Sequence, residues 1–315
     1  MSTAQELVRA QAARLTALDP LLPDDVHAPA GAEPLAARTA DGHAVVALIA
    51  HESNPTGSPR GLWQADEVFE LFPILGAHPR AGMDAVLAEW RRWMAERDDP
   101  GQDSASLVVW PSRDVQATRA LLDHGFVPLS VLAVRPPTRV AEEAPNNTEL
   151  SGTVKVRRAG PADLDAVVEL TLAELEYAAL VGTATYRPDA AKLKRAAAGA
   201  RLSSGDPVWL AEQDGTPVAV AECGWIDTGR SPRTYRLRAG SWGYVNCVSV
   251  RERWRGTGVG QRLMATAHNE LVRAGAVGTF LYYNPPNPLS SVFWPRQGYR
   301  PLWTTWEVRP ATALR

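Results

Sequence analysis

The chain has 315 residues, which is enough for two ordinary domains or one large one. Its composition, with 45% hydrophobic and 22% charged residues, is that of a globular protein. A formal net charge of −2 provides no basic field, so we expect neither a nucleic-acid partner nor attachment to an acidic membrane surface.

Residues 1–22 have the spacing of an amphipathic helix and do not resemble a signal peptide. No apolar run approaches the length that spans a bilayer, so the sequence predicts a cytoplasmic protein. Cys223 and Cys247 both lie in apolar, strand-like runs. We expect them to be reduced packing residues, and we expect no metal site.

The N-terminal half begins its regular structure with a hairpin. An Asp-Gly pair at positions 41 and 42 lies between strand-like residues 34–39 and 43–50. Further on, a helix is predicted to start at Asp114 and to end at Gly125. Residues 136–153, which contain prolines and polar side chains, then predict a linker.

The C-terminal half predicts strands and helices in alternation, with a second Asp-Gly hairpin. In chain order these are a strand at 153–158, helices at about 161–179 and 189–200, hairpin strands at 208–213 and 217–225, a long strand at 242–250, a helix to about 274, a strand at 279–283, a helix at 287–294 and a final strand at 303–308.

A glycine-rich turn follows the long strand, in the pattern Arg255-x-x-Gly258-x-Gly260. Glycines where a strand passes into a helix allow backbone N–H groups to surround an anion, and the helix start favours a phosphate. The pattern is neither the dinucleotide fingerprint, which needs three glycines, nor a P-loop, which needs a following Lys-Ser/Thr pair.

A second motif follows at Asn287, where an N-cap with proline at the next position starts the last helix, and Gly298-Tyr299 ends it. Together the two motifs resemble the acyl-CoA-binding signature of the GNAT superfamily of N-acetyltransferases. Ser290 departs mildly from the family pattern. Trp294 departs more seriously, because the family usually has a Tyr there.

The resemblance implies an α/β fold in which a mixed, mostly antiparallel sheet is flanked by helices. Several markers recur 173 residues apart, namely positions 41 and 214, 114 and 287, and 125 and 298. We therefore expect two GNAT-like domains in tandem: a degenerate copy at residues 1–137, a linker at 138–152 and a catalytic domain at 153–315.

The N-terminal copy is expected not to bind CoA. Aligned with the glycine-rich turn, Pro79 replaces the Arg and cannot donate a backbone hydrogen bond. Asp84 replaces the last glycine and would place a carboxylate beside a pyrophosphate, for which Arg80 could compensate in part.

By the same resemblance, the C-terminal domain binds acetyl-CoA as co-substrate, and the amine attacks the thioester directly. Arg255 would contact the pyrophosphate, the edge of the long strand would bind the pantetheine arm, and a backbone N–H near Val248 would stabilise the thioester oxygen. The expected acyl-CoA-binding residues are Val248, Val250, Arg255, Gly256, Thr257, Gly258, Val259, Gly260 and Asn287.

The general base is not fixed by the sequence. The family often has a Glu where this chain has Tyr244, so Glu222 on the neighbouring strand and Tyr244 itself are the candidates, with Glu174 and Glu176 weaker. Since an indole cannot act as an acid, Ser290 is the candidate for passing a proton to the leaving thiolate through water.

The function expected is that of an N-acetyltransferase for a small-molecule amine. A non-catalytic acyl-CoA sensor and a mycothiol-synthase-like acetyltransferase are the alternatives, and both a monomer and a homodimer stay open. Four strand tryptophans either pack in the core or line an acceptor cleft; they are Trp225, Trp242, Trp303 and Trp306.

Overall fold

The computed structural model describes residues 4–23, 29–55, 57–137, 154–229 and 236–315, so the expected linker lies outside it. The chain forms two compact units, each built from separate stretches of sequence. The first comprises Met1–Leu132, Arg233–Arg238 and Pro301–Arg315, and the second comprises Ala133–Pro232 and Ala239–Arg300.

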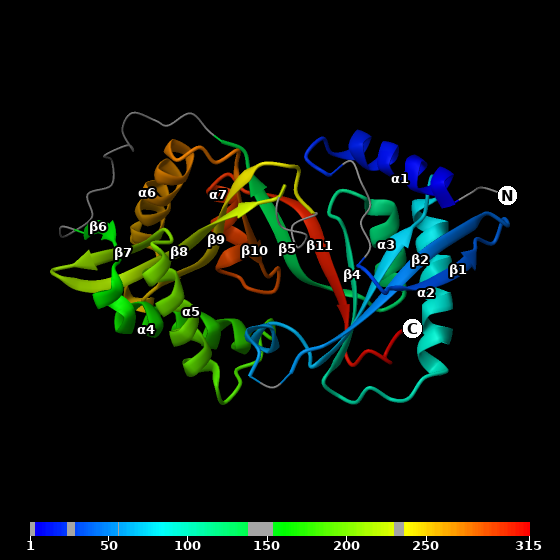
Figure 1. Cartoon of the computed structure of the whole chain (residues 1–315), viewed down its shortest axis with the longest axis horizontal. Coiled ribbons are helices and arrows are strands. Elements are labelled where there is room, and N and C mark those ends of the chain that lie inside the picture. The colour runs from blue at the N-terminus through cyan, green and yellow to red at the C-terminus, as the bar shows by residue number, and fades with distance from the viewer. Residues whose placement is uncertain (1–3, 24–28, 56, 138–153, 230–235) are drawn as a thin grey trace. The chain divides into compact units, whose positions relative to one another are not determined.

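The first unit is a sheet with helices along it (Figure 1). Its helices are α1 (Ala4–Leu18), α2 (Pro79–Ala95) and α3 (Val115–Asp123). Its strands are β1 (Glu33–Arg38), β2 (Ala44–Ser53), β3 (Glu67–Ile74), β4 (Ser104–Pro111) and β11 (Arg300–Val308). Strand β5 (Val127–Arg135) contributes residues to both units.

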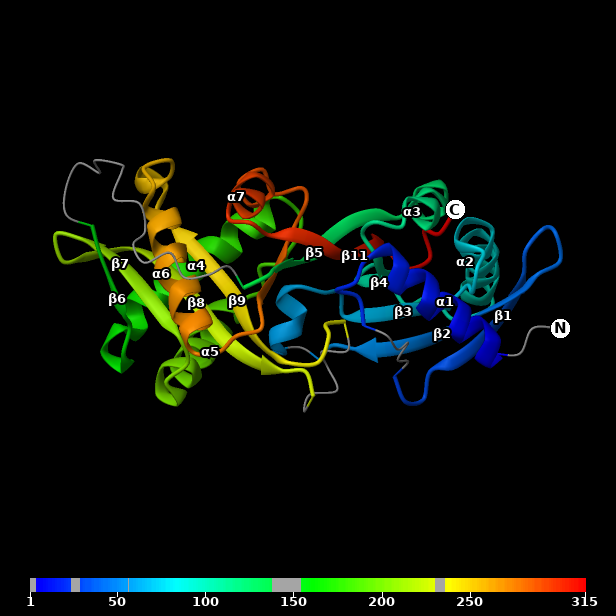
Figure 2. The ribbon, with the colours of Figure 1, turned by 90° about the horizontal axis from the view of Figure 1, so that it is seen from above.

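Pairing in this sheet is antiparallel from β1 to β2 and from β2 to β3, and parallel from β3 to β4, which are connected through α2. Figure 2 shows α2 and α3 side by side along one face of these strands. The core between helices and sheet includes Val45, Ile49, Leu71, Met83, Leu87, Trp90, Leu121 and Phe126.

The last strand lies in the first unit, which the sequence did not predict. β11 pairs antiparallel with β4, from Trp303 opposite Pro111 to Val308 opposite Ser106. Trp306 is 7% exposed within the core of this unit. The alternating pattern of residues 303–308 correctly predicts a strand, but nothing local specifies the sheet edge that the strand joins. The expected division into consecutive segments therefore differs from the observed units at the C-terminal end.

The second unit alternates helices and strands. Its strands are β6 (Val154–Arg158), β7 (Val208–Gln213), β8 (Thr216–Asp227), β9 (Ser241–Val250) and β10 (Thr279–Tyr283). Its helices are α4 (Leu164–Leu180), α5 (Ala190–Ser204), α6 (Val259–Arg273) and α7 (Ser290–Arg296).

Antiparallel pairs run from β6 through β7 and β8 to β9, and a parallel pair joins β9 to β10. Helices α4 and α5 pack on the face that carries Val208, Leu210 and Val220, and α6 lies on the other side of the strands (Figure 1). The mixed, mostly antiparallel α/β architecture predicted from the sequence is confirmed.

Both Asp-Gly hairpins are confirmed, joining β1 to β2 and β7 to β8. At the second turn Asp214 has φ 50° and Gly215 has φ 78°, the positive values that a two-residue type I′ turn requires. Helix α7 starts at Ser290, three residues later than predicted, although the Asn287 side chain still accepts hydrogen bonds from N–H groups at its amino end. Cys223 and Cys247 are buried and form no disulfide.

Candidate functional site

A bulge in β9 is the first feature that shapes the site. Glu222 of β8 lies opposite Cys247 and Cys223 lies opposite Val245, so Asn246 has no partner across the pair. An extra residue of this kind bends the strand and interrupts the ladder, and such bulges are common beside active sites. On its other side β9 pairs with β10 at Gly243, Tyr244 and Val245.

A pocket of about 520 Å³ opens where β9 and β10 stop pairing. Residues 245–250 of β9 form one wall, and Tyr282, Tyr283 and Asn284 at the end of β10 form another. Helix α4, the glycine-rich turn and α7 complete the lining, and all of these residues belong to the second unit. An unpaired strand edge inside a pocket can bond to an extended, amide-bearing ligand.

The glycine-rich turn opens onto one end of this pocket. Gly256 has φ 77° and Gly258 has φ 87°, in the left-handed region that glycine adopts without strain. Helix α6 starts directly afterwards at Val259, with no side chain capping its first N–H groups. Unpaired donors at the positive end of a helix dipole favour the binding of an anion.

The side chains of two residues in the turn serve the structure of the turn itself. The Thr257 hydroxyl donates to the carbonyl oxygen of Trp254 at 2.7 Å, which fixes the loop, and the Val259 side chain is fully buried. Among the described residues neither contributes to the pocket lining, whereas Arg255, Gly256, Gly258 and Gly260 do. The Arg255 backbone N–H already donates to the Glu252 carbonyl oxygen at 3.0 Å, so its side chain is the part that faces a ligand of the turn.

Arg255 is held at the mouth of the turn. Its Nε donates to the Val250 carbonyl oxygen at 3.1 Å, and its guanidinium carbon lies 5.2 Å from the centre of the Tyr177 ring. These contacts orient the guanidinium while leaving its terminal nitrogens for an anion. Val248 and Val250 both line the pocket, as expected for the strand edge that would bind pantetheine.

The amino end of α7 forms a further wall. The Asn287 Oδ1 accepts hydrogen bonds from the backbone N–H groups of Leu289 at 3.0 Å and Ser290 at 3.2 Å. This is the capping interaction that the sequence predicted for Asn287. The Ser290 hydroxyl bonds to the carbonyl oxygens of Asn284 and Asn287, at 3.3 and 3.2 Å. Trp294 also lines the pocket, one turn after Ser290.

The candidate base residues differ in whether they line the pocket. Glu222 is 4% exposed, accepts a hydrogen bond from Asn246 Nδ2 at 3.1 Å, and does not lie on the wall as far as the chain is described. Tyr244 is also absent from the described lining, and its ring stacks on Phe280 with centroids 4.9 Å apart. Burial raises the pKa of the Tyr244 phenol.

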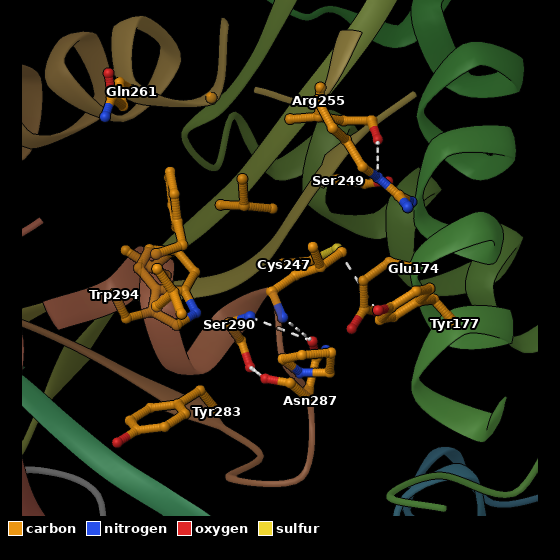
Figure 3. A pocket seen from close by; sticks show the side chains of 18 of the residues that line it. Glu174, Tyr177, Cys247, Ser249, Arg255, Gln261, Tyr283, Asn287, Ser290 and Trp294 are labelled. Atoms are coloured by element: carbon orange, nitrogen blue, oxygen red, sulfur yellow. Dashed lines mark hydrogen bonds between the residues drawn. The ribbon is translucent and has the colours of Figure 1, made fainter. Parts of the chain in front are cut away.

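Glu174 on α4 does line the pocket, with a side chain that is 28% exposed. Figure 3 shows it extending with Tyr177 toward Cys247 and Asn287, with Trp294 on the other side of Cys247. Positions 174 and 177 share a helix face, which was the sequence signal available. Glu176 lies on the exposed side of the same helix.

Desolvation raises the pKa of the Glu174 carboxyl; the positive charge of Lys194 lowers it and the negative charge of Glu222 raises it. Lys194 Nζ lies 3.8 Å from Glu174 Oε2, and the Cys247 thiol donates to the same oxygen at 3.9 Å. A carboxyl with a raised pKa, open to a pocket, holds a proton more readily than an exposed carboxyl and can take one from a group bound there.

Aromatic side chains complete the lining, and sequence reasoning missed several of them: Tyr177, Tyr282, Tyr283, Trp254 and Phe293. The four tryptophans considered from the sequence are not among the described lining residues. Trp303 and Trp306 belong to the first unit, Trp242 is 4% exposed in β9, and Trp225 is 38% exposed on β8.

Residues 165–299 match the model of the acetyltransferase (GNAT) family. Over this segment the chain is similar to GNAT acetyltransferase domains. The segment contains every described residue of the pocket wall, from Glu174 to Arg296. The family match supports an acyltransferase enzyme.

Several solved structures of GNAT proteins are similar to this chain. A GCN5-related N-acetyltransferase from Sphaerobacter thermophilus is 18% identical, covers 98% of this chain and 92% of its own, and has a TM-score of 0.55. A GNAT-family acetyltransferase from Colwellia psychrerythraea is 12% identical over 98% and 97%, with a TM-score of 0.49. One from Ralstonia eutropha JMP134 is 23% identical over 47% and 94%, with a TM-score of 0.40.

The Sphaerobacter likeness shows the fold and nothing finer. A comparison with curated protein sequences gives no match. None of the described helices combines the length and the apolar character needed to cross a bilayer.

Proposed function

We propose that the second unit binds an acyl-CoA, with acetyl-CoA as its co-substrate, and transfers the acyl group to the nitrogen of a small amine. The observation that carries this proposal is the meeting of two ligand-binding features in one pocket. The uncapped, glycine-flanked start of α6 and the unpaired edge of β9 both open into it.

In this proposal the pyrophosphate binds at the start of α6. Arg255 supplies a charge-assisted contact, and backbone N–H groups from Gly256 to Gly260 supply the remaining donors. Thr257 and Val259 take part through their backbone alone, since their side chains are engaged or buried. The pantetheine amides bond to the edge of β9 around Val248 and Val250, beside Asn287 at the start of α7.

The chemistry then takes place next to the bulge. A backbone N–H near Val248 stabilises the negative charge that develops on the thioester oxygen during attack. Ser290 lies on the wall and is the group on α7 that could pass a proton to the departing thiolate through water. The cytoplasmic location expected from the sequence stays a prediction.

Titration calorimetry with CoA tests the binding half of the proposal. Gly260→Asp places a carboxylate beside the expected pyrophosphate and should abolish detectable binding. Gly260→Ala is the matched control, because a Cβ at this position meets Val250 and Phe293 at ordinary distances of 3.4 and 3.5 Å. Wild-type protein that does not bind CoA, or an Asp variant that binds like the Ala variant, contradicts the proposal.

We also propose that the first unit is a degenerate copy that binds no CoA. Pro79 is the first residue of α2, and Gly82 N already donates to the His78 carbonyl oxygen at 2.8 Å. The residues aligned with the glycine-rich turn are therefore part of a helix, and no open loop is left there for a phosphate. Asp84 lies further along α2, 2.9 Å from His124 Nε2.

A non-catalytic acyl-CoA sensor is the second candidate, favoured by Trp294 on the wall where the family usually has a Tyr. Release of free CoA thiol in the presence of amines separates the two. CoA binding without thiol release on any primary amine favours the sensor. The mycothiol-synthase-like alternative has no specific support among the described pocket residues.

A further inference from the structure

The charged side chains on the pocket wall are distributed unevenly. Among the described lining residues Glu174 is the one carboxylate, whereas Arg255 and Arg296 are the cations. Arg255 stands at the glycine-rich turn, where the proposed function places phosphates. The negative charge is thus confined to the stretch of wall made by α4 and Cys247.

Glu174 is held in place from several sides. Lys194 from α5 lies 3.8 Å from its carboxylate, and the Cys247 thiol of β9 donates to it. Glu222 lies behind it on β8, where Asn246 Nδ2 donates to the Glu222 carboxylate at 3.1 Å. The other described lining residues that titrate or carry charge are Tyr177 on α4 itself and, from the other walls, Arg255, Tyr282, Tyr283 and Arg296.

We propose that Glu174 takes the proton from the acceptor, and that the acceptor is a primary amine carrying a single positive charge. This inference rests on the proposed function, because it assigns a residue and a substrate class within the same pocket.

Every proton and every bond in the proposed step is accounted for. The ammonium gives one proton to the Glu174 carboxylate, and its freed lone pair attacks the thioester carbonyl carbon. A C–N bond forms and the C–S bond breaks, and the second nitrogen proton ends on the CoA sulfur. Glu174 then returns its proton to solvent through the pocket, so no further reactant is required.

The other candidates are placed less well for this role. A base must come within hydrogen-bond reach of the proton that it removes, directly or through one water. Glu222 is behind the wall and acts on Glu174 by its charge, which makes it a positioning residue. The Tyr244 phenol is stacked on Phe280, and burial raises its pKa above the usual tyrosine value, so it stays protonated at neutral pH and cannot take up the proton.

The charge of the acceptor follows from the same distribution. Glu174, the ion-paired Lys194 and the nearby Glu222 together carry a formal charge of −1, which balances one ammonium group, and Arg296 on the same wall opposes further positive charge. The uncharged remainder of the wall is largely aromatic or aliphatic and suits an apolar body. Its members near the end of β10 and on α7 include Tyr282, Tyr283, Leu289, Val292 and Phe293.

The first experiment needs no acceptor. Infrared titration of the carboxyl C=O band compares wild-type protein with Glu174→Gln and with Glu176→Gln, an exposed residue on the same helix. We expect a carboxyl group that titrates above the usual glutamate range in wild type and Glu176→Gln and is missing from Glu174→Gln. A titration that Glu174→Gln leaves unchanged overturns the proposal.

The second experiment measures thiol release from acetyl-CoA with four probes: 2-phenylethylamine, tyramine, spermidine and kanamycin. We expect turnover of the two monoamines and a loss of at least about 100-fold in kcat for Glu174→Gln, with an unchanged Kd for CoA. The wild-type rate should rise with pH as Glu174 ionises, and Glu176→Gln should keep that profile.

The outcomes test the base, the substrate class and the proposed function separately. A Glu174→Gln rate within threefold of wild type overturns the assignment of the base. Turnover of spermidine or kanamycin in preference to the monoamines, or of none of the four probes by protein that binds CoA, overturns the substrate class. Wild-type protein that fails to bind CoA refutes the proposed function itself.

Discussion

The side-chain oxygen of Gln11 accepts a hydrogen bond from the backbone N–H of Leu75 at 2.6 Å. The amide nitrogen of the same side chain donates to the Pro73 carbonyl oxygen at 2.9 Å. Helix α1 thus satisfies both kinds of backbone group at the end of β3. The region of the second unit that corresponds under the proposed tandem arrangement, the end of β9 before its glycine-rich turn, opens into the pocket instead.

Helix α1 makes further contacts with the rest of the first unit. Arg14 Nη1 lies 2.6 Å from Asp114 Oδ2, and in the proposed tandem arrangement Asp114 is the counterpart of Asn287. The Leu7 side chain packs closely against Gly76: a Cβ added at Gly76 would lie 2.9 Å from Leu7 Cδ2. An occupied strand end leaves no room for a pantetheine arm, which supports the proposal that the first unit binds no CoA.

The first prediction concerns Gln11, which is 2% exposed. Replacing it with Leu leaves a buried N–H and a buried carbonyl without partners, so the free energy of unfolding should fall by about 2–4 kcal/mol. Urea denaturation followed by circular dichroism measures this. Gln5→Leu, at an exposed position of the same helix, is the control and should change stability little. Equal effects of the two substitutions would contradict a specific role for Gln11.

Local chemistry explains what the sequence could predict. The Asp214-Gly215 turn is fixed by its own residues, since both take positive φ. Asn287 caps the start of α7 because its side chain reaches N–H groups two and three residues ahead. Such features depend on a few neighbouring residues and can be recognised without the fold.

The remaining features depend on contacts between distant parts of the chain. The position of Glu174 on the pocket wall follows from the bulge at Asn246 and from the packing of α4 on β9. Neither of these features leaves a pattern in the sequence. Glu222 shares an apolar strand face as expected, yet its side chain points to Asn246 behind the wall. The pairing of β11 with β4 is likewise decided by tertiary structure.

The second prediction concerns Gly256, where φ is 77° and a Cβ would meet nothing within 4 Å. Any effect of substitution must therefore come from the backbone conformation and not from a clash. Gly256→Val should weaken CoA binding about tenfold, because a β-branched residue resists positive φ by about 1–3 kcal/mol. Gly256→Asn, which tolerates this region, should stay within about threefold. Calorimetry in which Val and Asn bind equally would exclude a preorganised turn.

The third prediction concerns His268, which is 5% exposed and whose Nε2 lies 2.9 Å from the Tyr299 hydroxyl oxygen. Burial lowers the pKa of His268 to about 3, from 6.5. The unfolded chain therefore binds one proton more than the folded chain between these values. Stability should fall as pH drops from about 6.5 toward 3, by up to about 1.4 kcal/mol per pH unit.

Thermal melts from pH 7 to pH 4 test this contribution. His268→Gln, which can still hydrogen-bond to Tyr299 but does not titrate, should flatten the pH dependence of Tm. His51→Gln changes a histidine whose side chain is 49% exposed and serves as the control. If His268→Gln and wild type lose stability in parallel on acidification, the buried histidine is not the source.

The fourth prediction concerns Trp294, which is 8% exposed and meets Phe293 and Tyr299 edge-on, with centroids 4.9 and 5.4 Å apart. An indole N–H is not an acid near neutral pH, so the residue should contribute packing and wall shape instead of a proton. Trp294→Phe keeps an aromatic ring and should leave kcat within about threefold. Trp294→Ala should lower stability by about 3–5 kcal/mol. Steady-state kinetics and urea denaturation on the two variants separate these roles, since a large loss of kcat in the Phe variant at unchanged stability would show that the N–H takes part in the reaction.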